Sequence, residues 1–135
     1  MRFMVFVFPE PKAYLAGQMP SNELIAKMTE YNQQLISAGI LLAGDGLAPP
    51  SQGARIEFPA GKGTLVDGPF AESKEVVGGY WMWQTKSREE AIEWARRCPM
   101  QPGDVMEIRR VFEMEDFAPS PEVDAAYKVM TDNKK

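Results

Sequence analysis

The sequence predicts one α+β domain in which a split βαβ unit carries an inserted hairpin. Apolar segments with the period of strands alternate with segments that have the period of a helix, in the order β, α, β, hairpin, β, α, β. A chain of 135 residues, 44% of them hydrophobic, can bury one core without disulfides or metal. We therefore expect a single domain over residues 1–117 and a short extension over residues 118–135.

The first strand and the first helix are the clearest elements. Residues 1–8 are apolar on both faces of a period-two pattern, which predicts a central strand covered on both sides and ended by Pro9 and Pro11. A helix begins at the N-cap Ser21 and ends before Gly39. Its apolar face comprises Leu24, Met28, Tyr31 and Leu35.

The middle of the chain combines short strands with glycine-bearing turns. Residues 40–43 read as a buried strand that runs into a turn at residues 44–47. Residues 54–58 and 64–66 predict a hairpin that leads into Asp67-Gly68-Pro69-Phe70. Residues 76–85 predict an aromatic strand with Trp81 and Trp83 on one face and Tyr80 and Met82 on the other.

The last third repeats the helix and strand pattern. Ser87 and Glu90 form a capping box that starts a helix, and this helix stops before Pro99. Residues 104–112 alternate as a half-buried strand, and a short amphipathic helix follows Pro121. The whole order is that of a ferredoxin-like fold. Two helices cover one face of such a sheet, so its other aromatic face predicts a homodimer.

Charge and composition exclude several function classes. The net charge is −4 and the basic residues are scattered, so we expect no direct binding of nucleic acid. The first apolar run is too short for a membrane span or a signal peptide, and Cys98 is the single cysteine, which favours the cytoplasm. The sequence contains no dinucleotide fingerprint and no histidine or cysteine cluster, so we expect no cofactor and no metal.

Several motifs in a fixed order resemble one family. They are Gly44-Asp45-Gly46-Leu47, Asp67-Gly68-Pro69-Phe70 with Glu72-Ser73-Lys74-Glu75, Gly78-Gly79-Tyr80 and Glu107-Ile108-Arg109-Arg110. Together they resemble the DGPF-domain branch of the YCII-related proteins over residues 1–117. The resemblance implies a ferredoxin-like fold that pairs into a dimeric α/β barrel, and a link to extracytoplasmic-function (ECF) sigma factors. It also implies a His/Asp site, which this chain does not reproduce because it contains no histidine.

Asp67 is the candidate catalytic residue. Without histidine, acid/base work requires a carboxylate whose pKa is raised by burial or by a neighbouring charge. Asp67 follows an apolar strand, where a cleft can open. The alternative is structural, because Asp before Gly-Pro accepts the backbone hydrogen bonds that set a turn.

The candidate ligand-binding residues surround this turn. Lys74 offers a charge to an anionic ligand and Glu72 shares its loop, although such a charged run is typical of a solvated loop. Asp45 is expected to shape a turn between two glycines or to act as a second carboxylate in the cleft. Tyr80 is assigned to packing or to the pocket wall, and either Arg109 or Arg110 can face the cleft.

Three functions follow from these residues. The first is a homodimer that binds a small molecule and has a regulatory role beside transcription. The second is an enzyme that uses Asp67 as general acid or base on a small polar substrate. The third is an interaction module whose C-terminal helix contacts a partner subunit or a sigma factor.

Overall fold

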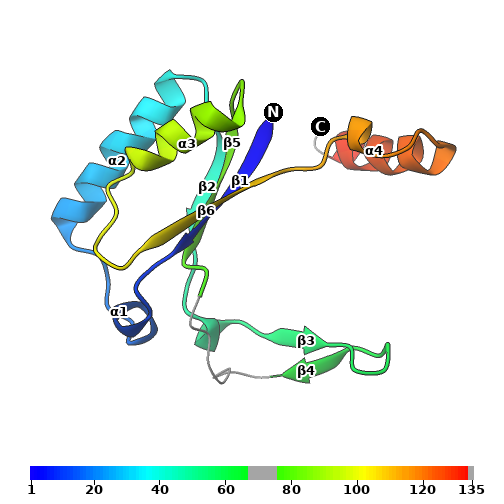
Figure 1. The fold of residues 1–135 in the computed structure, drawn as a ribbon. Coiled ribbons are helices and arrows are strands. Elements are labelled where there is room, and N and C mark those ends of the chain that lie inside the picture. The colour runs from blue at the N-terminus through cyan, green and yellow to red at the C-terminus, as the bar shows by residue number, and fades with distance from the viewer. Residues whose placement is uncertain (67–75, 134–135) are drawn as a thin grey trace.

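The computed structural model describes residues 1–66 and 76–133 (Figure 1). A four-stranded sheet has the order β2 (Leu41–Gly46), β5 (Gly79–Gln84), β1 (Arg2–Phe8) and β6 (Val105–Arg110). Neighbouring strands are antiparallel. Helices α2 (Asn22–Ser37) and α3 (Arg88–Arg96) lie on one face of the sheet. The predicted α+β class and the order of a split βαβ unit are confirmed.

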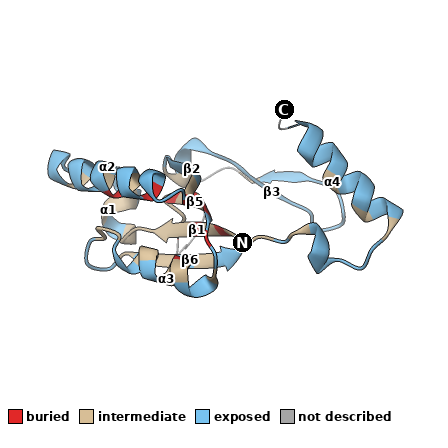
Figure 2. Ribbon diagram, turned by 90° about the horizontal axis from the view of Figure 1, so that it is seen from above, coloured by how far each residue is buried: buried red, intermediate tan, exposed pale blue. Residues whose placement is uncertain are grey.

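The core lies between the sheet and these two helices. Alternate residues of β1 and β5 point to this side and meet one face of α2 and the buried Ala91 of α3. The side chains that form this buried cluster are Phe3, Val5, Tyr31, Leu35, Ile40, Trp81, Trp83 and Ala91. Figure 2 shows this buried strip beneath α2 and within the sheet. The prediction that Trp81 and Trp83 share one face of their strand is confirmed.

Both long helices start at the predicted serines. The backbone N–H of Leu24 donates to Ser21 Oγ at 3.1 Å, and that of Glu90 donates to Ser87 Oγ at 3.1 Å. The Glu90 carboxylate accepts from the N–H of Lys86 at 3.2 Å, one residue before the expected donor. Gly39 follows α2 with φ of 73°, a conformation that favours glycine.

A short helix, α1 (Pro11–Leu15), lies where only a strand end was predicted. Glu10 is its N-cap and accepts from the N–H groups of Lys12 and Ala13, each at 3.1 Å. Pro11 occupies its first turn, where the missing N–H costs nothing. The two prolines therefore end the strand and start a helix.

The second face of the sheet has no covering helix among the described residues, and we call it the open face (Figure 1). On β1 it carries Met4, Phe6 and Phe8, all of them half-buried. Within residues 1–66 and 76–133, helices therefore cover β1 on one side only, not on both sides as predicted. The period-two pattern was apolar on both sides because both faces of the strand carry large side chains, but helices pack on one of them.

Two further pieces extend from the sheet. The predicted hairpin consists of β3 (Arg55–Glu57) and β4 (Thr64–Val66) and follows the short 3-10 turn η1 (Pro50–Gln52). After β6 comes a second 3-10 turn, η2 (Met114–Asp116), and then the helix α4 (Pro121–Asn133). In Figure 1 the hairpin and α4 lie at opposite ends of the sheet, and both extend away from α2 and α3.

Candidate functional site

The candidate site is a hydrogen-bonded pair, Asp45 and Tyr80, at the edge of the open face. Strand β2 continues through Gly46, so Asp45 lies in a strand opposite Tyr80 of β5. The Tyr80 hydroxyl donates to Asp45 Oδ2 at 2.9 Å. The interpretation of Asp45 as a turn residue is therefore wrong, because the strand pairing extends three residues beyond the predicted end at residue 43.

Two glycines bring these strands together. A Cβ on Gly44 would lie 2.6 Å from Cδ1 of the Trp81 ring, so the indole occupies the space of a side chain. A Cβ on Gly79 would lie 3.2 Å from the carbonyl oxygen of Asp45. Trp81 is itself held by the bond from its Nε1 to Asn32 Oδ1 at 2.9 Å. The glycines flanking the pair thus fit the register that joins Asp45 to Tyr80.

The Asp45 carboxylate favours the protonated form of the Tyr80 hydroxyl. The hydrogen bond to Asp45 raises the pKa of Tyr80, and the negative charge of the same carboxylate adds to the effect. Tyr80 is therefore a protonated donor at neutral pH. Its oxygen can still accept a hydrogen bond from a second molecule.

The strand registers place an apolar floor beside this pair. Phe6 lies opposite Tyr80 on one side and opposite Glu107 on the other, so these three residues and Asp45 form one row across the sheet. The next row contains Ala43, Met82, Met4 and Arg109. A surface with apolar residues between one polar pair and two charged groups suits a small amphipathic molecule.

The residue pair 109 and 110 separates as the strand alternation requires. Arg109 lies on the open face, one strand beyond Met4. Arg110 forms a bidentate pair with Asp116, with both N···O distances 2.8 Å. Arg109 is therefore the arginine that is available to the open face, although β1 separates it from Asp45 and Tyr80.

Three predicted residues, Asp67, Glu72 and Lys74, lie outside the described residues. Phe6 and Met4 were not singled out as site residues, and Glu107 was named only within a family motif, although the period-two pattern of residues 1–8 and 104–112 contained the signal. Tyr14 was also missed. Its hydroxyl donates to the carbonyl oxygens of Leu47 and Ala48 at 2.9 and 3.0 Å, which ties α1 to the segment after β2.

The described ranges 1–66 and 76–133 contain neither a cluster of metal-binding side chains nor a membrane-spanning helix. No group of three or more His, Cys, Asp or Glu side chains is placed to hold a metal ion there. Within the same ranges, no helix combines the length and the apolar character that crossing a bilayer requires.

Comparisons with known proteins found a matching family model, a similar protein sequence and a similar solved structure. The family model of the YCII-related domain matches residues 1–115. An uncharacterized protein of Rhizobium meliloti (strain 1021) is 27% identical over 97 residues, which are 71% of this chain and 78% of the relative. A similar solved structure is 5-chloro-2-hydroxyhydroquinone dehydrochlorinase from Burkholderia phenoliruptrix AC1100 in complex with 2,5-dihydroxybenzoquinone. The two chains are 15% identical in sequence and superpose with a TM-score of 0.45. The match covers 85% of this chain and 98% of the dehydrochlorinase chain.

Proposed function

The chain belongs to the family of proteins with a YCII-related domain, and from this premise we propose that it is a homodimer that binds a small molecule on the open face of its sheet. The observation that carries the proposal is the Asp45–Tyr80 pair beside apolar side chains on a face without a covering helix among the described residues. Two such faces, turned toward each other, would make the dimeric α/β barrel that the family resemblance implies.

The exposed area supports a second copy. A compact monomer of 15.1 kDa exposes roughly 7,100 Å² by the usual scaling with mass, whereas this chain exposes 9919 Å². The excess, about 2,800 Å², exceeds the ~800 Å² that each partner buries in a standard interface. Half-buried Met4, Phe6, Phe8 and Met82 supply an apolar centre for such an interface.

The ligand chemistry follows from the polar groups. Asp45 Oδ2 accepts the hydrogen bond from the Tyr80 hydroxyl. The Tyr80 oxygen and Asp45 Oδ1 can therefore accept hydrogen bonds from a ligand. A ligand with an apolar body and an O–H or N–H donor matches them. An acidic group at its other end would match Arg109, which lies across Met4.

A panel of small phenols and aromatic carboxylates tests this proposal by thermal shift, followed by titration of each compound that raises the melting temperature. We expect Tyr80→Phe to weaken binding about tenfold, because the ligand loses one hydrogen bond to the tyrosine oxygen. Tyr127→Phe on α4 is the matched control and should bind as the unchanged chain does. Equal affinity of the Tyr80→Phe and unchanged chains would contradict the assignment of the site.

The enzyme hypothesis is the second candidate, and the Asp45 carboxylate in hydrogen-bond contact with Tyr80 favours it as an acid/base group on the open face. The role of Asp67 as acid or base stays a prediction from the sequence. Asp67→Asn and Asp45→Asn separate the two carboxylates: turnover of a bound compound that is lost in only one variant identifies the group involved.

The regulatory role, the sigma-factor partner and the cytoplasmic location also stay predictions from the sequence. Co-purification of the tagged chain with a sigma factor from its own cells would support the partner. A sigma factor absent from the purified dimer under low salt would count against it.

A further inference from the structure

The hairpin β3–β4 is a poorly buried arm. None of its strand residues is buried, and Ile56, Phe58 and Leu65 are 51%, 65% and 58% exposed. An isolated two-stranded hairpin is marginally stable in water at best. Its apolar side chains therefore require another surface.

Helix α4 is a second arm of the same kind. It packs on η2 through Phe117 and Tyr127, whose hydroxyl donates to the carbonyl oxygen of Phe112 at 3.3 Å. It has no buried residue, and Val129 and Met130 are 67% and 59% exposed. A helix of this length is marginal without tertiary packing, so this arm too requires a partner surface.

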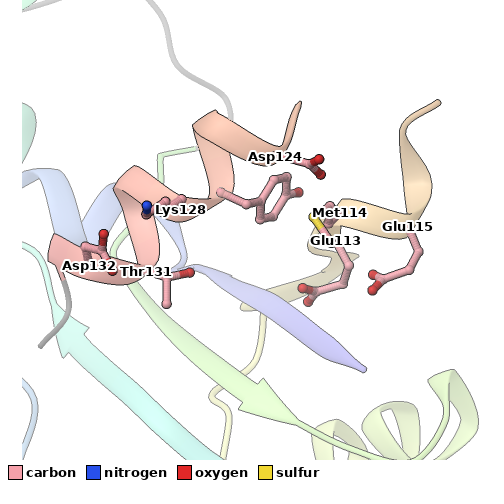
Figure 3. A pocket seen from close by; sticks show the side chains of 8 residues that line it. Glu113, Met114, Glu115, Asp124, Lys128, Thr131 and Asp132 are labelled. Carbon is pink, nitrogen blue, oxygen red and sulfur yellow. The ribbon is translucent and has the colours of Figure 1, made fainter. Parts of the chain in front are cut away.

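An acidic groove runs between η2 and α4 (Figure 3). Its volume of about 360 Å³ is at the small end of the range for ligand pockets. Carboxylates from both walls line it, with one lysine among the lining residues: Glu113, Glu115, Asp124, Asp132 and Lys128. Met114 and Tyr127 add apolar surface. The groove suits a basic segment with apolar neighbours.

The hairpin has the complementary character. Arg55 and Lys62 outnumber Glu57 among its charged residues, and all three are exposed. Lys62 lies in the turn between the two strands, and the exposed Phe58 precedes the same turn. Within one chain the hairpin and α4 lie at opposite ends of the sheet, so this hairpin does not reach its own groove (Figure 1).

We infer that the hairpin of one copy docks into the groove between η2 and α4 of a second copy. A two-fold axis that turns the open faces together and exchanges the two ends of the sheet sets each hairpin against the other chain's α4. Both arms extend away from α2 and α3, as this arrangement requires. The contact occurs twice and clasps the dimer. The inference rests on the homodimer proposed above.

Charge reversal in the full chain tests the contact, with the dimer dissociation constant measured by analytical ultracentrifugation. Lys62→Glu should weaken the dimer about tenfold, because a modest exposed ion pair is lost twice in each dimer. Adding Glu115→Lys and Asp124→Lys to Lys62→Glu should restore most of the affinity. Lys27→Glu on α2 makes the same change in charge on the helical side and should leave the constant within about twofold.

A disulfide crosslink gives a second readout, which does not depend on small changes in the free energy of dimerisation. In a Cys98→Ser background, Lys62→Cys with Asp124→Cys should form a disulfide-linked dimer under mild oxidation, whereas either cysteine alone should not. A dimeric wild type that is insensitive to the reversals and gives no linked dimer overturns the docking and leaves the homodimer intact. A monomeric wild type overturns both. Circular dichroism confirms that each variant is folded.

Discussion

At the scale of single residues, two contacts define the candidate site. Asp45 and Tyr80 are 35 positions apart in the chain and meet because β2 pairs with β5. Gly44 leaves room for the Trp81 ring beside that pairing. The site therefore depends on the contact of Asp45 with Tyr80 and on the contact of Gly44 with Trp81.

The pKa of Tyr80 reports the first contact. Because Asp45 raises that pKa, Tyr80 should ionise at higher pH than an ordinary tyrosine, and Asp45→Asn should lower its pKa toward the usual value. The pair should stabilise the fold below pH 10.0 and lose this effect as the pH rises above it. Titration of ¹³C-labelled tyrosine by NMR measures the ionisation. An unchanged pKa in Asp45→Asn would show that the pair is not formed.

Gly44→Ala tests the second contact. The new methyl group meets Trp81 at 2.6 Å, so we expect a loss of about 1–3 kcal/mol in the free energy of unfolding. Gly46→Ala is the control, because a Cβ there has nothing within 4 Å. Urea denaturation followed by tryptophan fluorescence gives both values. Equal stability of the two variants would contradict the close approach.

At the scale of elements, ion pairs attach the C-terminal segment to the sheet. Arg2 Nε donates to Glu113 Oε1 at 2.8 Å, and Arg110 binds both carboxylate oxygens of Asp116. Asp116 also accepts from the N–H of Glu113 at 2.7 Å, which closes the turn η2. The aromatic contacts of Phe117 then place α4 on this turn.

The attachment should fail in acid. The hydrogen bonds from Arg110 and from the Glu113 backbone lower the pKa of Asp116 from 3.8 to about 2. A lowered pKa stabilises the fold above the unfolded value, so this contribution is present above pH 3.8 and is lost as the pH falls toward 2. The protection of η2 and α4 against hydrogen exchange, relative to the intrinsic rate at each pH, should fall in that window. Asp116→Asn should reduce the pH dependence, and the remainder belongs to Glu113, whose pKa is lowered by its hydrogen bond from Arg2. A dependence that Asp116→Asn leaves unchanged would contradict the role of Asp116.

At the scale of the whole molecule, the sheet has one covered face and one open face. Trp83 and Val5 are fully buried on the covered side, while Met82 and Met4 stay half-buried on the other. The hairpin and α4, which extend from the sheet with exposed apolar side chains, contribute to the area that the chain exposes beyond a compact monomer of its mass.

Light scattering at micromolar concentration should therefore give twice the 15.1 kDa of one chain. Met82→Glu places a charge at the centre of the open face and should give a folded monomer, because a buried unpaired charge is costly. Ile36→Glu, at a position that is 61% exposed on α2, should remain a dimer. A monomeric wild type, or a dimer that survives Met82→Glu, would contradict the face-to-face arrangement.

The sequence by itself determined the local elements of this protein. The periodicity around Leu35 and Trp83, the caps at Ser21 and Ser87 and the hairpin were all predictable, because each depends on residues close together in the chain. Tertiary structure decided the rest. It extended β2 to bring Asp45 to Tyr80, selected Arg109 rather than Arg110 for the open face, and placed the helices of the described residues on one side of β1. These outcomes depend on strand register and on pairs far apart in sequence, where no local preference acts.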